Sequence, residues 1–197
     1  MGYLETMDSR LFLFLNGLHT DWLDPIMVSI TEMWPWIPLY VFWIFLLFKH
    51  YGKRGWWVLL GVALVVLCSD QLSAHVCKPV FHRLRPCFNP ELEGLVYLPK
   101  GLPGGRFGFV SSHAANTFAI AAFLTPVLRK AWRWIGWVLY GWAFISSYSR
   151  IYMGAHYPGD IFCGAVLGIL IGLVFWKLLD LFFKNHLDRR AKLNTPK

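Results

Sequence analysis

The sequence predicts an all-α membrane protein: a polytopic bundle of five transmembrane helices preceded by an amphipathic helix. Hydrophobic residues make up 56% of the 197 residues and charged residues only 15%, too little charge to cover a soluble domain of this length. Apolar stretches of roughly 20 residues, the length of a bilayer crossing, recur along the chain. Lys and Arg gather in short clusters between these stretches. We therefore expect one compact domain over residues 1–197, inserted in a membrane.

The first elements are the least regular. Residues 1–24 mix apolar and polar side chains at helical spacing, which predicts an amphipathic helix lying in the membrane interface. A sixth crossing there is the alternative. Residues 35–48 are apolar but short, and reach crossing length only if the helix extends back to Pro25. Pro35 and Pro38 would then kink that helix, and Glu32 would need a polar partner or the interface.

Four further transmembrane helices follow from clear apolar runs: Trp56–Val76, Ala114–Leu128, Trp132–Tyr148 and Ile161–Trp176.

The basic clusters predict the orientation. They comprise Lys49, Lys53 and Arg54, then Arg129, Lys130 and Arg133, then Lys184, Arg189, Arg190, Lys192 and Lys197. If the five helices alternate, all three clusters fall on one side, which the positive-inside rule makes the cytosol. Residues 184–197 then form a basic cytosolic tail, and residues 77–113 and 149–160 face the periplasm or exterior. The net charge of +8 does not favour nucleic-acid binding, because it is divided among these clusters.

The first outer segment contains KPVFHRLRP, residues 78–86. Pro79 is expected to end the preceding helix at Lys78, with Arg83 and Arg85 on a short turn. Basic residues at helix ends commonly contact lipid head groups. This cluster, however, lies on the side where the charge bias disfavours it, so a role in binding an anion is the stronger interpretation.

The same outer segment ends in GFVSSHAANTFA, residues 108–119. Ser111 or Ser112 is a good N-cap for the helix that follows, whose first backbone N–H groups form an anion site. His113 lies in the first turn. A helix start with one histidine is also a common structural feature, so this segment alone does not indicate a function.

The second outer segment is SRIYMGAHYPGD, residues 149–160. Arg150 has a fork of donors suited to phosphate oxygens. Asp160 can accept a hydrogen bond from the ring nitrogen of His156 that carries the proton. The other ring nitrogen is then left to attack or to bind. The alternative is that Asp160 only caps its helix and His156 packs beneath it.

Together these segments indicate phosphate chemistry. Three cations, one helix N-terminus and two histidines would meet at one depth of the membrane, without a metal-ligand cluster. Such groups neutralise a phosphoryl group during transfer, and fit a phosphate ester better than a peptide or a sugar.

The same residues resemble a known family, the type 2 phosphatidic acid phosphatases, which are related to vanadium haloperoxidases and bacterial acid phosphatases. Its three-part pattern is Lys-x6-Arg-Pro, Pro-Ser-Gly-His and Ser-Arg-x5-His-x3-Asp. The first part matches at Lys78, Arg85 and Pro86, and the third at Ser149, Arg150, His156 and Asp160. The middle part reads Val110-Ser111-Ser112-His113, so its Pro and Gly are replaced.

The resemblance implies a role for each residue. His156 would attack phosphorus and become a phosphohistidine, with Asp160 orienting it, and His113 would protonate the leaving oxygen. The phosphate oxygens would be held by Lys78, Arg85, Arg150, Ser111 and the backbone N–H of Ser112. No metal or other cofactor is implied.

The membrane context favours a lipid phosphate or diphosphate as substrate. The outward site favours undecaprenyl diphosphate, with lipid A next, then phosphatidylglycerol phosphate and phosphatidic acid. A catalytically silent lipid-binding or channel protein is the alternative from another class. The sequence leaves the oligomeric state open, and also whether Cys77 and Cys87, which flank a polar segment, form a disulfide.

Overall fold

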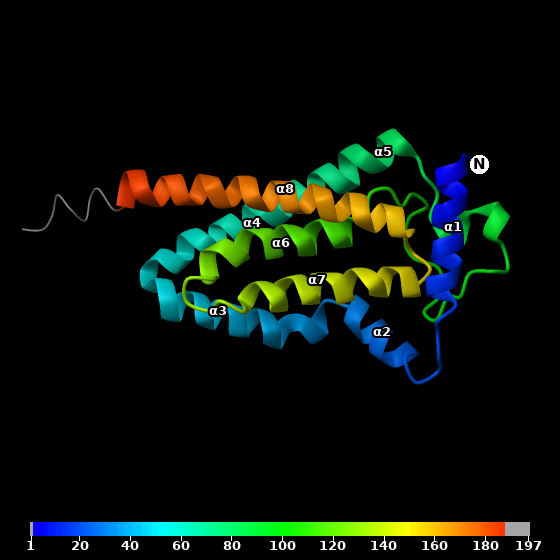
Figure 1. Ribbon diagram of the computed structural model, residues 1–197, viewed down its shortest axis with the longest axis horizontal. Coiled ribbons are helices and arrows are strands. Elements are labelled where there is room, and N and C mark those ends of the chain that lie inside the picture. Colours follow the sequence, from blue (N-terminus) through cyan, green and yellow to red (C-terminus); the bar gives the residue numbers. More distant parts are fainter. Residues whose placement is uncertain (1, 188–197) are drawn as a thin grey trace, which may run out of the picture.

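The computed structural model describes residues 2–187 as a helical bundle. Between these residues the only pairing of extended segments is a single bridge from Leu84 to Phe107. The helices are α1 (Tyr3–Asn16), α2 (Asp24–Thr31), α3 (Ile37–Tyr51), α4 (Gly55–Gln71), α5 (Lys78–Phe81), α6 (Ser112–Leu128), α7 (Ile135–Tyr152) and α8 (Pro158–Phe182). Helices α3, α4, α6, α7 and α8 run along the long axis of the molecule, and α1 lies across one end (Figure 1). The all-α prediction is confirmed.

Helix α6 forms the centre of the bundle and packs most extensively against α8. The contact is close because α8 presents glycines to α6 at every fourth position: Gly164, Gly168 and Gly172. A Cβ atom on Gly168 would lie 2.1 Å from the carbonyl oxygen of Ala115. The two backbones therefore touch, as small residues allow in membrane helix pairs.

The outer faces of the bundle are apolar. Many large hydrophobic side chains are exposed on them, among them Trp137 at 85% and Phe162 at 70%, as expected for contact with lipid. Two apolar stretches are long enough to span a bilayer, Trp34–Phe81 and Pro158–Asn185. The first contains the antiparallel pair α3 and α4, which reverses direction at Gly52, where φ is +51°. Five crossings remain a prediction.

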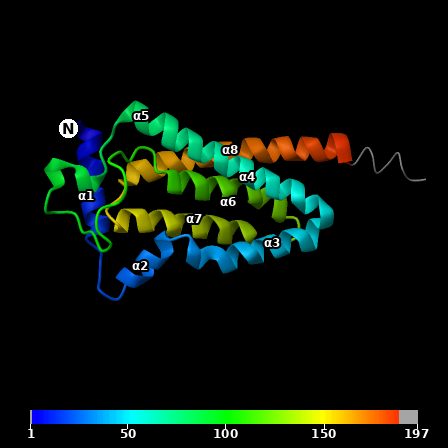
Figure 2. The ribbon, with the colours of Figure 1, turned by 180° about the vertical axis from the view of Figure 1, so that it is seen from behind.

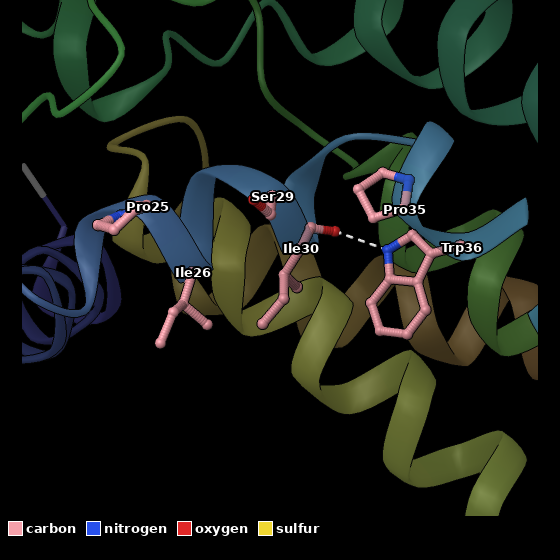
Figure 3. A pocket seen from close by; sticks show the side chains of 6 residues that line it. All are labelled: Pro25, Ile26, Ser29, Ile30, Pro35 and Trp36. Atoms are coloured by element: carbon pink, nitrogen blue, oxygen red, sulfur yellow. Dashed lines mark hydrogen bonds between the residues drawn. The ribbon is translucent and has the colours of Figure 1, made fainter. Parts of the chain in front are cut away.

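The prediction of one kinked helix from Pro25 to Phe48 was wrong. The chain leaves the helical conformation at Glu32 (φ −81°, ψ 154°) and re-enters it through a 3-10 turn, Trp34–Trp36. Pro35 and Pro38 lack the N–H groups that would continue the helix ladder. The Trp36 indole bridges the break by donating to the Ile30 carbonyl over 2.8 Å (Figure 3). Glu32 has the expected polar partner, Lys100.

The expectation that Pro79 ends its helix at Lys78 was also wrong. Lys78 is helical (φ −61°, ψ −44°), and the helix continues to Phe81. A π-helical segment, Leu72–Cys77, precedes it, and the Lys78 N–H bonds the carbonyl of Ser73, five residues back. This wider turn leaves room for the proline ring. The helix ends where His82 adopts a left-handed conformation (φ +48°).

The two ends of the bundle differ in character. The basic turns at 52–54 and 129–134 lie at one end, whereas α1, residues 82–111 and residues 153–157 lie at the other (Figures 1 and 2). The 184–197 tail begins at the basic end, and its residues 188–197 lie outside the described part of the chain. Cys77 and Cys87 are free thiols.

Helix α1 is amphipathic, as predicted, but it is also bound to the bundle. It buries Ser9, Phe12 and Asn16 and exposes an opposite apolar face that includes Leu4 and Phe14. The Asn16 amide donates to the carbonyls of Ile151 and Tyr152 over 3.2 Å and 2.9 Å. These bonds fix α1 across the end of α7, so it does not run beside the bundle helices.

Candidate active site

The three segments singled out in the sequence meet at the α1 end of the bundle. The Lys78 ammonium donates to the Ser112 hydroxyl over 3.0 Å, joining the start of α5 to the start of α6. Lys78 is also within Coulombic range of Arg85 and Arg150. The three cations predicted to bind phosphate therefore form one electrostatic group.

Arg85 is buried and Arg150 is partly buried, and each has an unused donor. Arg85 is 7% exposed and donates from Nε to the Phe107 carbonyl over 3.3 Å. Arg150 donates from Nη1 to the Thr31 hydroxyl, at the end of α2, over 2.6 Å. Arg85 Nη1 and Arg150 Nε are buried without a hydrogen-bond partner among residues 2–187. Buried N–H groups are normally paired, so these donors mark a place for an anion.

The start of α6 supplies the third side of the site. Ser111 is the N-cap, with its hydroxyl 3.5 Å from the Ala114 N–H, and the helix begins at Ser112, two residues before the predicted start. Its first N–H groups and positive dipole end face the site. His113 Nε2 lies 3.0 Å from the Ser146 hydroxyl of α7, a partner that the sequence did not indicate.

His156 and Asp160 are both buried and lie next to each other, but their separation is longer than the hydrogen bond predicted between them. His156 is 3% exposed, and its Nδ1 lies 3.5 Å from Asp160 Oδ2. That is longer than a well-formed hydrogen bond, and Nδ1 meets no other acceptor among the described residues. Burial lowers the pKa of His156 to about 4, although Asp160 raises it. The imidazole is therefore neutral at pH 7, the form that a nucleophile needs.

Asp160 has two further partners. It caps α8 by accepting the Tyr157 N–H at Oδ2 over 3.1 Å, so the alternative of a capping residue is also realised. At Oδ1 it accepts from Arg83 over 2.7 Å. Sequence reasoning counted Arg83 only as one of the outer basic residues. Nothing in the sequence pairs these two residues, because they lie 77 positions apart.

Two glycines shape the space around His156. A Cβ atom on Gly108 would lie 3.0 Å from Asp160 Oδ2 and 3.5 Å from His156 Nδ1, so a side chain there would crowd the pair. Gly154 has a φ of +68°, which turns the chain after α7 toward His156. A Cβ on Gly154 would collide with the side chains of Val96 and Leu98.

The assembled site is basic, with two histidines at its centre. No group of three or more His, Cys, Asp and Glu side chains that could hold a metal ion is found among residues 2–187. A hollow of about 430 Å³ at the α2–α3 break lies on another face of α2 and contains no charged side chain (Figure 3). The arrangement can bind a phosphoryl group and transfer it to a neutral imidazole.

Comparisons with known proteins agree with this arrangement. Residues 54–184 match the sequence model of the PAP2 superfamily. The chain is 39% identical to the lipid A 4'-phosphatase of Bacteroides thetaiotaomicron, over 98% of this chain and 84% of that protein. It is 29% identical to the undecaprenyl-diphosphatase BcrC of Bacillus subtilis, over 89% of this chain and 86% of that protein. The crystal structure of Aquifex aeolicus LpxE superposes with a TM-score of 0.62, covering 85% of this chain and 93% of that one at 27% identity.

Proposed function

The chain belongs to the PAP2 superfamily and is a lipid phosphatase, and on that premise we propose that it removes the 4'-phosphate of lipid A at the outer face of the membrane. The observation that carries the chemistry of the proposal is that a buried, neutral His156 lies within Coulombic range of Arg85 and Arg150, both of which have unused donors.

The similarity to a lipid A 4'-phosphatase over nearly the whole chain supports this substrate. Sequence analysis favoured undecaprenyl diphosphate. That remains the second candidate, supported by the lower similarity to BcrC. The phosphate-binding residues do not distinguish the two lipids, because both offer the same phosphoryl group.

In the proposed first step, His156 attacks phosphorus with Nε2, since Nδ1 faces Asp160. The bond between phosphorus and the sugar oxygen breaks, and His113 donates a proton to that oxygen. Ser146 holds Nε2 of His113, which leaves the other ring nitrogen for this transfer. Lys78, Arg85 and Arg150 neutralise charge on the oxygens around phosphorus as the bond breaks.

In the second step, water attacks the phosphohistidine and His113 accepts its proton. The products are inorganic phosphate and the lipid with a free hydroxyl group. The side chains present supply every proton transfer in this scheme, so we propose that the reaction needs no metal.

A panel of purified lipids tests the substrate. The enzyme in detergent would be given lipid A, undecaprenyl diphosphate, phosphatidylglycerol phosphate and phosphatidic acid with divalent cations chelated, and released phosphate would be measured. We expect the highest kcat/KM for lipid A, with loss of the 4'-phosphate rather than the 1-phosphate. Faster phosphate release from undecaprenyl diphosphate would show that the second candidate is the substrate and that lipid A is not.

Two histidine variants test the mechanism. His156→Ala should abolish both turnover and phosphoenzyme formation, since the nucleophile is gone. His113→Ala should still form phosphoenzyme from substrates with good leaving groups, because only the general acid is missing. Acid-labile labelling of His156→Ala equal to that of the wild type would contradict the roles assigned here.

A further inference from the structure

We propose that Asp8 of helix α1 is a positioning residue for the reaction, acting on His156 through Arg83 and Asp160. The inference rests on the proposed function, in which His156 is the nucleophile. It adds to the site a residue of α1, a helix that lies outside the three motif segments.

Arg83 is the bridge between the two carboxylates. Its Nη1 donates to Asp160 Oδ1 over 2.7 Å, and its Nη2 donates to Asp8 Oδ2, also over 2.7 Å. The guanidinium carbon lies 4.2 Å from the centre of the Tyr157 ring. Arg83 is thus held on two edges and one face, and its position depends on both acids.

Asp8 is itself held against the start of α8. Its Oδ1 accepts the N–H of Gly159 over 2.8 Å, one residue before Asp160. A Cβ atom on Gly159 would lie 2.6 Å from Asp8 Oδ2, so the carboxylate reaches this position only because residue 159 lacks a side chain. Asp8 is 15% exposed and Arg83 is 23% exposed, which limits screening of their charges by solvent.

The bridge sets what Asp160 can do. With Oδ1 occupied by Arg83, the carboxylate presents Oδ2 to Nδ1 of His156. Burial lowers the pKa of Arg83, but the charges and hydrogen bonds of Asp160 and Asp8 raise it by more, so the guanidinium stays ionised. Removing Asp8 leaves Arg83 held by Asp160 and the Tyr157 ring alone, so the guanidinium can shift. Asp160 would then shift with it and turn Oδ2 away from Nδ1 of His156, against the single restraint of the Tyr157 N–H. Substrate binding, which uses Lys78, Arg85 and Arg150, is not touched by this change.

Three single variants test the proposal on the full chain, with phosphate release from lipid A as readout. Asp8→Asn keeps an oxygen for the Gly159 N–H but loses the charge that holds Arg83. Gly159→Ala displaces the Asp8 carboxylate and leaves every charge in place. We expect each to lower kcat about 10-fold and to change KM less than about 2-fold. Glu5→Gln removes a carboxylate one turn earlier on α1 and should match the wild type.

A double-mutant cycle separates positioning from a general loss of structure. Arg83→Gln should lower kcat about 100-fold, and adding Asp8→Asn to it should cost nothing further, because Asp8 acts only through Arg83. If the losses of kcat from Arg83→Gln and Asp8→Asn multiplied in the double variant, the proposal that Asp8 acts through Arg83 would be wrong. So would a wild-type kcat in both Asp8→Asn and Gly159→Ala. If His156→Ala retained activity, the proposed mechanism would fail instead, so the two failures can be told apart.

Discussion

His156 is enclosed on all sides, and this has a consequence for the pH range in which the protein is stable. Burial lowers its pKa to about 4 in the folded chain, whereas an unfolded chain titrates the same group near its ordinary value of 6.5. Below pH 6.5 the unfolded state binds the proton and the folded state does not. The contribution of neutral His156 to stability is therefore complete above pH 6.5 and is lost as the pH falls toward 4.

Thermal unfolding in detergent at a series of pH values checks this. The melting temperature of the wild type should fall between pH 6.5 and pH 4, and that of His156→Gln should fall less, because Gln does not titrate. Parallel curves for the two proteins would mean that His156 titrates in the folded protein as it does in the unfolded chain, and would contradict the lowered pKa. The Cε1 signal of ¹³C-labelled histidine, assigned by its absence in His156→Gln, gives the midpoint directly.

The unused donors of Arg85 and Arg150 lead to a second prediction at the residue scale. Orthovanadate offers the oxygens that these N–H groups lack, so it should inhibit the enzyme and raise its melting temperature. Arg150→Lys keeps the charge but loses the planar fork, and should weaken inhibition about 10-fold or more. Arg106→Lys makes the same change at an exposed position and should have no effect. Inhibition that depends on an added divalent cation would contradict a site built from side chains alone.

The residues that the sequence revealed and those that it missed differ in kind. Lys78, His113 and His156 could be singled out because each stands out locally, as a charge or an imidazole beside an apolar run. Ser146 and Thr31 could not, and Arg83 could be noted only as one of the basic residues, because the roles of all three come from partners on other helices. No local pattern encodes a contact between α1 and the start of α8.

At the scale of the helix, the glycine face of α8 determines how closely the two histidine-bearing segments approach. Gly168→Ala would place a methyl group against the α6 backbone, where the carbonyl oxygen of Ala115 would be 2.1 Å away. We expect a loss of about 1–3 kcal/mol of stability as the helices separate, together with lower activity.

Gly141→Ala on α7 is the matched control, since nothing lies within 4 Å of the position of its Cβ. It should leave stability unchanged or raise it by roughly 0.5–1 kcal/mol, because alanine favours the helix. Chemical denaturation of both variants in the same detergent makes the comparison. Equal stabilities would show that α6 and α8 are not held at contact distance.

The sequence predicted which segments form helices better than it predicted where those helices begin and end. The apolar runs located α4, α6, α7 and α8, but α8 extends to Phe182, six residues past the predicted end at Trp176. The errors at Glu32 and Pro79 have one cause: proline removes a backbone donor, and the fold compensates in ways that the sequence does not display. At Glu32 the helix breaks and the Trp36 indole, four residues later, bridges the break. At Pro79 a wide π-helical turn makes room for the proline ring.

For the molecule as a whole, the separation of the basic turns from the site predicts how it sits in the membrane. The turns at 52–54 and 129–134 lie at the end opposite the loop between α7 and α8, residues 153–157 (Figure 1). If that end is cytosolic, the site faces outward and acts on lipids already in the outer leaflet.

Labelling of single cysteines in intact cells tests this orientation. In a background without Cys68, Cys77, Cys87 and Cys163, cysteine would be placed at Leu102, which is 63% exposed near the site, or at Lys53 in the basic turn. An impermeant thiol reagent should label Leu102→Cys, and should label Lys53→Cys only after the membrane is opened. The reverse pattern would invert the topology.

The touching backbones of α6 and α8 also bear on temperature. No side chain lies between Gly168 and the carbonyl of Ala115 to rearrange on warming, so we expect the two helices to move together. One helix carries His113, the acid, and the other carries Asp160, which orients the nucleophile His156, so main-chain contacts set the offset between acid and nucleophile. We expect warming to leave this geometry unchanged until the bundle melts. A break in an Arrhenius plot of kcat below the melting temperature of the protein would then report a phase change in the surrounding lipid. The activity of the enzyme would thus respond to the physical state of its own membrane.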